Sequence, residues 1–292
     1  MRIIIFLFTS IILLISSQSG ILASSQTDSV IVKKDIPYSS RDSAKTRLDL
    51  YLPARSGGLR PGVLLVHGGG WRGGDRTQWG ELARVLAKNG FVCASAGYRL
   101  LPEHPFPAAI SDVRLAMDYF KSHAAEYSLD PKKVGAVGSS AGGHLVALLA
   151  TIGPGDRLGD EEGKLSWDTR PQAVACYNPV LDFVNEPRIW PHQLLIFNET
   201  PEQALSLYLE ESPALRVKGG EPPFLFLYGT QDDLTPEEKS RAMVTSLAAA
   251  GAPVEVAFFH GMKHGFGYSL VLPEQVRAAG VVADFFKRRL RY

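Results

Sequence analysis

The stretch Val134-Gly135-Ala136-Val137-Gly138-Ser139-Ser140-Ala141-Gly142-Gly143 decides the predicted fold. It begins as a short apolar run and ends in small residues that open a helix, 144–150. Gly138, Ser140 and Gly142 match the pattern G-x-S-x-G, in which a serine sits on a strained turn between a strand and a helix. The glycines leave room for a backbone conformation that a Cβ would block. The flanking strand and helix are the context that this pattern requires, so we predict that Ser140 is a nucleophile. An ordinary turn serine is the alternative.

Length and charge exclude several other classes. The 292 residues, 45% of them hydrophobic, fit one large α/β domain, with no internal repeat and no second core. The 31 basic and 30 acidic side chains form no basic stripe, so we expect no nucleic acid partner.

The N-terminus has the anatomy of a secretory signal peptide. A positive start, Met1-Arg2, precedes a mostly apolar run, 3–15, and the small residues Ala23-Ser24-Ser25 follow. The apolar run is shorter than the roughly 20 residues that span a bilayer. We therefore predict that residues 1–25 are cleaved near Ala23 or Ser25. The single domain 26–292 is then expected to be secreted or periplasmic, without stable membrane insertion. An uncleaved anchor is the alternative.

Strand and helix patterns alternate along the rest of the chain. An opening antiparallel hairpin is expected from 30–38 and 46–52. Further strands are expected at 63–66, 91–96, 173–177, 224–228 and 254–259, besides the strand before Ser140. Helices are expected at 78–89, 108–127, 237–250 and 273–290, and residues 182–213 are predicted to be irregular. This alternation predicts an α/β fold with a mostly parallel central sheet of about eight strands and helices on both faces.

A nucleophilic serine needs a base and an acid that orients the base. Asp232 and Asp233 follow the strand 224–228, at the ligand side of a parallel sheet. Asp232 is the preferred acid, because Asp233 is better placed to cap the helix that begins near Pro236. His264 lies deep in the loop after the strand 254–259 and is the predicted base, whereas His260 is expected to fix that loop by a hydrogen bond.

The segment His67-Gly68-Gly69-Gly70-Trp71 supplies candidate oxyanion donors. The backbone N–H groups of Gly69, Gly70 and Ala141 are predicted to bind the oxyanion, and one such donor can contribute about 2.7–4 kcal/mol. His67 itself is predicted to be structural. Trp71 is expected either to line the site or to pack beneath it.

Other motifs point to no cofactor. The histidines outside these loops show no metal-ligand spacing, and no G-x-G-x-x-G opens a helix after a strand. We therefore predict neither a metal nor a dinucleotide. Cys93 and Cys176 lie on non-adjacent predicted strands, which favours free buried thiols over a disulfide. Asp112, beside Arg114, is predicted to form a structural ion pair.

Taken together, these motifs resemble those of the α/β-hydrolase superfamily. More narrowly, the chain resembles secreted esterases of the feruloyl and acetyl-xylan esterase type, with the hormone-sensitive-lipase-like esterases as neighbours. The resemblance runs from about Leu48 to Phe286. It rests on His67-Gly68-Gly69-Gly70-Trp71, Tyr98-Arg99-Leu100, Gly138-Ser139-Ser140-Ala141-Gly142-Gly143-His144, Gly229-Thr230-Gln231-Asp232 and His264-Gly265-Phe266. It implies the same nucleophile, acid and base.

The chain departs from these families in three places. Gly97 stands where an aspartate is usual, and Ser139 stands where the lipase-like branch usually has aspartate. We also expect the N-terminal helical cap of that branch to be absent, because the roughly 40 residues between the expected cleavage point and His67 read as strands. An open site would admit an ester on a bulky polymer. The resemblance thus implies a serine esterase for short-acyl esters on carbohydrate or plant-polymer substrates. A lipase-like carboxylesterase is the alternative, and a peptidase or a non-catalytic binding module are more distant ones. Trp71, Trp190 and Phe197 are the candidate substrate-binding residues and could form a slot for a feruloyl ring.

Overall fold

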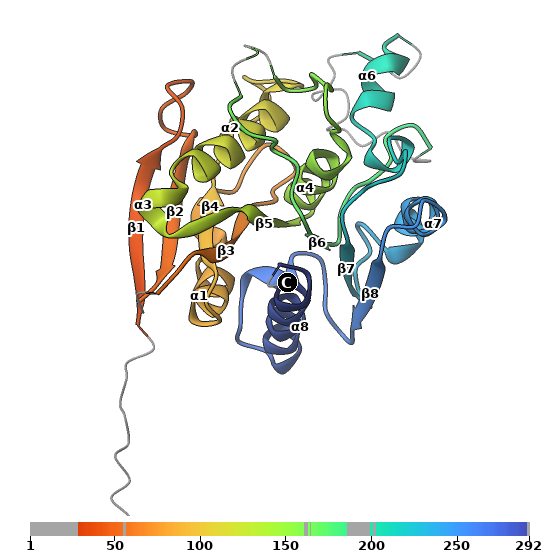
Figure 1. Ribbon diagram of the computed structural model, residues 1–292. Helices are drawn as coiled ribbons and strands as arrows, with labels where there is room; N and C mark the ends of the chain where they lie inside the picture. Colours follow the sequence, from red (N-terminus) through yellow and green to blue (C-terminus); the bar gives the residue numbers. More distant parts are fainter. Residues whose placement is uncertain are drawn as a thin grey trace, which may run out of the picture.

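The computed structural model describes residues 29–54, 57–160, 163, 165–185, 199–200 and 203–290, and one eight-stranded sheet organises them (Figure 1). The strands are β1 Val30–Pro37, β2 Arg47–Pro53, β3 Arg60–Val66, β4 Val92–Ala96, β5 Leu129–Ser139, β6 Val174–Tyr177, β7 Phe224–Gly229 and β8 Val254–Phe259. Their order is β1-β2-β4-β3-β5-β6-β7-β8. The pairs β1–β2 and β2–β4 are antiparallel and the others are parallel. The predicted opening hairpin and mostly parallel sheet are both confirmed.

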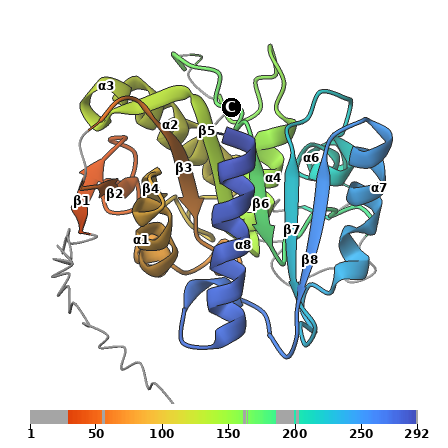
Figure 2. The same ribbon diagram turned by 60° about the horizontal axis from the view of Figure 1, so that its bottom comes forward.

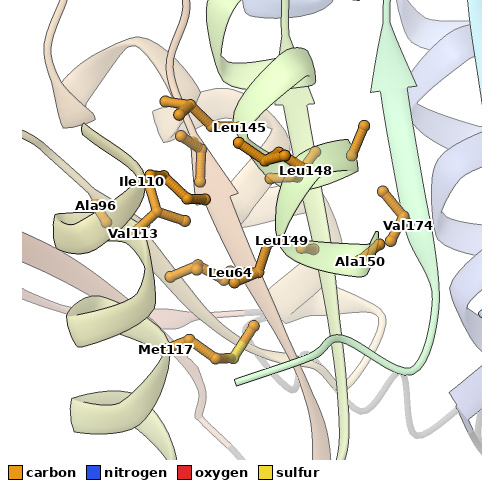
Figure 3. Close-up of a cluster of buried hydrophobic side chains, with 14 of the residues drawn as sticks. Leu64, Ala96, Ile110, Val113, Met117, Leu145, Leu148, Leu149, Ala150 and Val174 are labelled. Carbon is orange, nitrogen blue, oxygen red and sulfur yellow. The ribbon is translucent and has the colours of Figure 1, made fainter. Parts of the chain in front are cut away.

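Helices cover both faces of the sheet, as predicted (Figures 1 and 2). One face packs on α1 Gly80–Lys88 and α8 Pro273–Leu290. The opposite face packs on α2 Ala108–Ser122, α4 Ala141–Thr151 and α7 Arg241–Ala249. Figure 3 shows part of the core between α2, α4 and the sheet.

The continuous apolar run of β3 is explained by these two layers. Leu64 and Val66 belong to the cluster under α2 and α4, whereas Val63 and Leu65 belong to the cluster under α1 and α8. All four side chains are fully buried. A central strand of this kind is apolar on both faces, so it shows no alternation of apolar and polar residues.

Two expected elements differ in the structure. The helix expected at 108–127 is divided at His123 into α2 and α3 Ala124–Tyr127. The imidazole Nδ1 of His123 lies 2.9 Å from the Tyr119 carbonyl oxygen. The side chain therefore uses a carbonyl of the last turn of α2 as a hydrogen-bond acceptor. Within residues 182–213, predicted to be irregular, the structure contains α6 Leu205–Glu210. This helix is too short to show a clear helical periodicity in the sequence.

Several smaller predictions concern buried groups. Cys93 and Cys176 are free and buried on β4 and β6, which β3 and β5 separate, and burial raises the pKa of both thiols. Asp112 does form a structural ion pair, but its partner is Arg99, with Nη2 2.9 Å from Oδ1. The expectation of Arg114 as partner is wrong, because side chains two positions apart on a helix do not face each other.

The predicted signal peptide lies outside the described residues. Among the helices of the described part of the chain, none combines the length and the apolar character that crossing a membrane requires.

Candidate active site

Ser140 occupies a sharp turn between β5 and α4. Its backbone has φ 55° and ψ −119°, a conformation that costs a residue with a Cβ about 1–3 kcal/mol. The turn is held because the Ser140 N–H donates to the Tyr177 carbonyl at 2.9 Å. A Cβ on Gly138 would lie 2.2 Å from the Gly142 carbonyl oxygen, and one on Gly142 would lie 2.1 Å from that of Val66. Both glycines are therefore required by close backbone contact around the serine.

Asp232 and His264 are brought together at the carboxyl ends of β7 and β8. Asp232 Oδ1 accepts hydrogen bonds from the N–H groups of Leu234, at 2.8 Å, and Thr235, at 2.9 Å. Its Oδ2 lies 2.8 Å from His264 Nδ1. Burial acts to raise the pKa of the Asp232 carboxyl, but the hydrogen bonds from His264 and Thr235 outweigh it and lower that pKa. The ionised carboxylate holds a proton on Nδ1, which leaves Nε2 able to accept one.

The competing acid and base candidates lie apart from this pair. Asp233 is exposed, and the turn of helix at Glu237–Ser240 has Pro236 as N-cap with no side-chain cap, so the expectation that Asp233 caps it is wrong. His260 is also exposed, and its ring has no hydrogen-bond partner within the described ranges. The loop-fixing hydrogen bond expected of His260 is therefore not found there.

The glycine loop after β3 presents unused donors. Within the described part of the chain, no acceptor takes a hydrogen bond from the N–H of Gly69, Gly70 or Ala141. Ala141 begins α4, where the first N–H groups have no partner in the helix. The carbonyl of Gly69 accepts from the N–H groups of Arg72 and Gly73, which curls the loop.

His67 supports this loop from the protein interior. Its ring is buried, stacks on Tyr98 with 4.3 Å between centroids, and has Nδ1 2.8 Å from the Gly68 carbonyl oxygen. Burial lowers the pKa of His67 to about 4, so the ring is neutral at pH 7. These contacts agree with the structural role predicted for it.

A cavity of about 380 Å³ unites these groups, because Gly69, Gly70, Ser140 and His264 all line it. No hydrogen bond joins the Ser140 hydroxyl to His264 among the described residues. In ligand-free enzymes such contacts are commonly long and tighten when substrate binds.

One wall of the cavity is apolar and is formed by Trp71, Val180 and Phe183. The rings of Trp71 and Phe183 lie 5.7 Å apart, and the buried ring of His144 contacts them from behind at 5.4 Å and 5.1 Å. Trp71 therefore both lines the site and packs against the core. Trp190 and Phe197 lie outside the described residues.

Polar groups also line the cavity, on Gln78, Thr235 and Tyr268, and we call these three residues the polar wall. The Gly68 N–H donates to the Tyr268 hydroxyl oxygen at 2.5 Å, across 200 positions of sequence. Tyr268 follows His264 by four positions, so this bond joins the histidine loop to the glycine loop. Sequence reasoning missed Tyr268, since no local pattern marks a contact between segments so far apart.

In the described part of the chain, no group of three or more His, Cys, Asp and Glu side chains is arranged to hold a metal ion.

This architecture, with a serine turn after β5 and an Asp–His pair after β7 and β8, is the α/β-hydrolase fold. The chain belongs to the BD-FAE family, whose model matches residues 48–247.

Relatives and solved structures agree with that placement. The probable carboxylic ester hydrolase LipM of Mycobacterium tuberculosis is 33% identical over 220 residues, which cover 72% of this chain and 50% of LipM. The chain thus spans about half the length of that relative. A truncated carbohydrate esterase from gut microbiota has a TM-score of 0.78 at 23% identity, covering 91% of this chain and 99% of that one. The butyrate-bound esterase Est2 of Thermogutta terrifontis has a TM-score of 0.72 at 26% identity, covering 89% and 93%.

Proposed function

We propose that this chain is a serine esterase in which Ser140 is the nucleophile, His264 the base and Asp232 the orienting acid. The observation that carries the proposal is the 2.8 Å contact of Asp232 with His264, in a cavity that Ser140 also lines. The names of the relatives, such as the ester hydrolase LipM, support the reaction class.

In the proposed reaction, His264 Nε2 takes the hydroxyl proton as Ser140 Oγ attacks the ester carbonyl carbon. The carbonyl oxygen becomes an oxyanion, which the N–H groups of Gly69, Gly70 and Ala141 stabilise. Collapse of this intermediate breaks the bond to the alcohol oxygen, which receives the proton from His264. Water then attacks the acyl-enzyme by the same steps, releasing the acid and restoring Ser140.

An experiment with two chromogenic substrates tests the reaction class. Hydrolysis of p-nitrophenyl acetate, with negligible cleavage of a peptide anilide, is the expected result. Cleavage of the anilide at a comparable kcat/KM would identify a peptidase on this fold. Failure to hydrolyse either substrate would favour a binding module.

For the substrate, we infer a preference for acetyl to butyryl esters on carbohydrate or plant-polymer alcohols. The apolar wall is closed behind by buried His144, which limits the depth available to an acyl chain. Each further methylene gains about 0.8 kcal/mol only if it is buried. Est2 with bound butyrate and the carbohydrate esterase neighbour are consistent with this choice.

A panel of p-nitrophenyl esters from acetyl to decanoyl tests the acyl preference, with a feruloyl ester as a separate arm. We expect kcat/KM to fall beyond butyryl. A steady rise to decanoyl would instead favour a lipase-like carboxylesterase. Strong feruloyl activity would support a ring slot at Trp71, Trp190 and Phe197.

We also infer export after removal of residues 1–25, leaving one domain from residue 26. The positive start, the apolar run and the small residues around Ala23 support this inference. N-terminal sequencing of protein recovered from the periplasm or medium should begin near Ser24 or Gln26. Recovery of intact chain in the membrane fraction would support the uncleaved anchor.

A further inference from the structure

Gln78, on the polar wall, has its carboxamide fixed in one orientation. It belongs to a capping box at the helical turn Arg76–Trp79, in which Asp75 is the N-cap. The Asp75 N–H donates to Gln78 Oε1 at 3.2 Å. Because a backbone N–H can only donate, the oxygen must face Asp75 and the amide nitrogen must face away from it.

The amide nitrogen of Gln78 has no acceptor among the described residues, although the half-buried side chain lines the cavity. Its two N–H groups are therefore available to a ligand. The capping bond keeps the side chain in place without substrate, which reduces the entropy lost when it binds one.

Gln78 lies on the side of the cavity where the alcohol part of an ester must bind. His264 has to protonate the leaving oxygen, so the alcohol lies beside the histidine loop. Tyr268 and Gly265 of that loop line the cavity, and Trp79, next to Gln78, packs on Tyr268 with 4.7 Å between ring centroids. The acyl group is left with the apolar wall of Trp71 and Phe183.

We propose that the Gln78 amide nitrogen donates a hydrogen bond to a hydroxyl or ether oxygen of the alcohol part. Gln78 would then be a specificity-determining residue that selects polyhydroxylated alcohols, such as sugars, over apolar ones. This inference rests on the proposed esterase function and adds to it the residue that recognises the leaving group.

A pair of acetyl esters tests the inference. Mono-O-acetylated methyl xyloside and cyclohexyl acetate have the same acyl group and a six-membered ring, but only the first bears hydroxyl and ether oxygens in its alcohol part besides the ester oxygen. In Gln78→Glu a carboxylate oxygen can still accept from Asp75, because Glu also suits a capping box, but the amide donor is lost. We expect the ratio of kcat/KM for the xyloside ester to kcat/KM for cyclohexyl acetate to fall roughly 3- to 10-fold.

Two further variants separate the donor from other effects of the substitution. Gln231→Glu adds the same charge on the exposed neighbour of Asp232, outside the cavity lining, and should leave the ratio as in the wild type. Gln78→Met removes both donor and acceptor, and should lower the ratio as much as Gln78→Glu does, whatever it does to the melting temperature.

An unchanged ratio in Gln78→Glu would overturn the inference, as would an equal fall in Gln231→Glu. A fall of the ratio in Gln78→Met but not in Gln78→Glu would also overturn the inference, because it would assign the effect to loss of the capping acceptor for the Asp75 N–H. These outcomes leave the proposed reaction intact, because both esters need the nucleophile. That reaction is overturned separately if Ser140→Ala hydrolyses both esters at the wild-type rate.

Discussion

The two walls of the cavity are built from different kinds of contact. The apolar wall of Trp71, Val180 and Phe183 rests on a buried aromatic cluster that includes His144. The polar wall of Gln78, Thr235 and Tyr268 is held by directional hydrogen bonds, such as that from the Gly68 N–H to the Tyr268 hydroxyl. Packing tolerates variation in an acyl chain, whereas hydrogen bonds fix orientation. The difference is what the proposed function requires, namely a site that accepts an apolar acyl group and positions a polar alcohol.

The largest expected effect concerns Ser140, which lines the same cavity as both sets of residues. Ser140→Ala should lower kcat by roughly 10⁴- to 10⁶-fold, leaving only the catalysis that the oxyanion donors and binding provide. Circular dichroism should confirm an unchanged fold. Ser139→Ala, one position earlier, should retain most of the activity. If both variants lost activity equally, the assignment of the nucleophile would be wrong.

The next effect tests the Asp–His pair beside the polar wall. Asp232→Asn should reduce kcat by about 10⁴-fold, because an amide no longer selects the tautomer with a proton on Nδ1. His264→Ala should reduce turnover at least as severely. Asp233→Asn and His260→Ala, which change exposed side chains, serve as matched controls and should retain measurable activity. A more severe loss in either control would contradict the choice made within that pair.

Much of this arrangement could be predicted from local sequence. The strand, the glycines and the helix around Ser140 are adjacent in sequence, and their close packing leaves few alternatives. Asp232 and His264 were predictable because parallel strands bring their carboxyl ends to one edge. The sheet and the helices on both faces likewise follow from the alternation of strand and helix patterns along the chain.

The remaining features depend on contacts between distant segments. The partner of Asp112 is Arg99, which lies 13 positions earlier and outside α2, so helix spacing does not reveal it. The bond between Gly68 and Tyr268 joins two loops 200 positions apart. His144 looks in sequence like any polar residue near a helix start, yet it is buried behind Trp71.

A pH experiment tests whether water reaches the His144 ring, which packs behind the apolar wall. Burial lowers the pKa of His144 to about 4, although a hydrogen bond to the Glu211 carbonyl opposes the shift. Between about pH 6.5 and pH 4 the unfolded chain therefore binds a proton that the folded chain does not. The free energy of unfolding should fall by up to about 1.4 kcal/mol per pH unit as pH decreases through this window. Buried His67 should add a similar loss. Burial raises the pKa of Glu211, whose Oε1 lies 3.7 Å from His144 Nε2, and this carboxyl opposes part of the loss.

Urea unfolding at pH 7 and pH 5 measures this dependence. His144→Asn should show a smaller loss than the wild type, and part of the loss should persist because His67 remains. His260→Asn, at an exposed ring, should leave it unchanged. An equal loss of stability in wild type and His144→Asn would show that water reaches the ring and that the apolar wall is open from behind.

The smallest expected effect, about tenfold in kcat, is that of Tyr268→Phe on the polar wall. The variant keeps the ring that packs on Trp79 but removes the acceptor of the Gly68 N–H, the donor next to the proposed oxyanion amides. Losing one oxyanion donor outright costs about 10²- to 10³-fold, so a loop that only shifts should cost less. KM should stay within about twofold, because the donors act mainly on the transition state.

Trp79→Phe is the matched control: it weakens the packing and lowers the melting temperature but should keep most of kcat. If Tyr268→Phe raised KM at constant kcat, the hydroxyl would contact the substrate instead of tethering the glycine loop, and the polar wall would bind the alcohol through Tyr268 as well as Gln78.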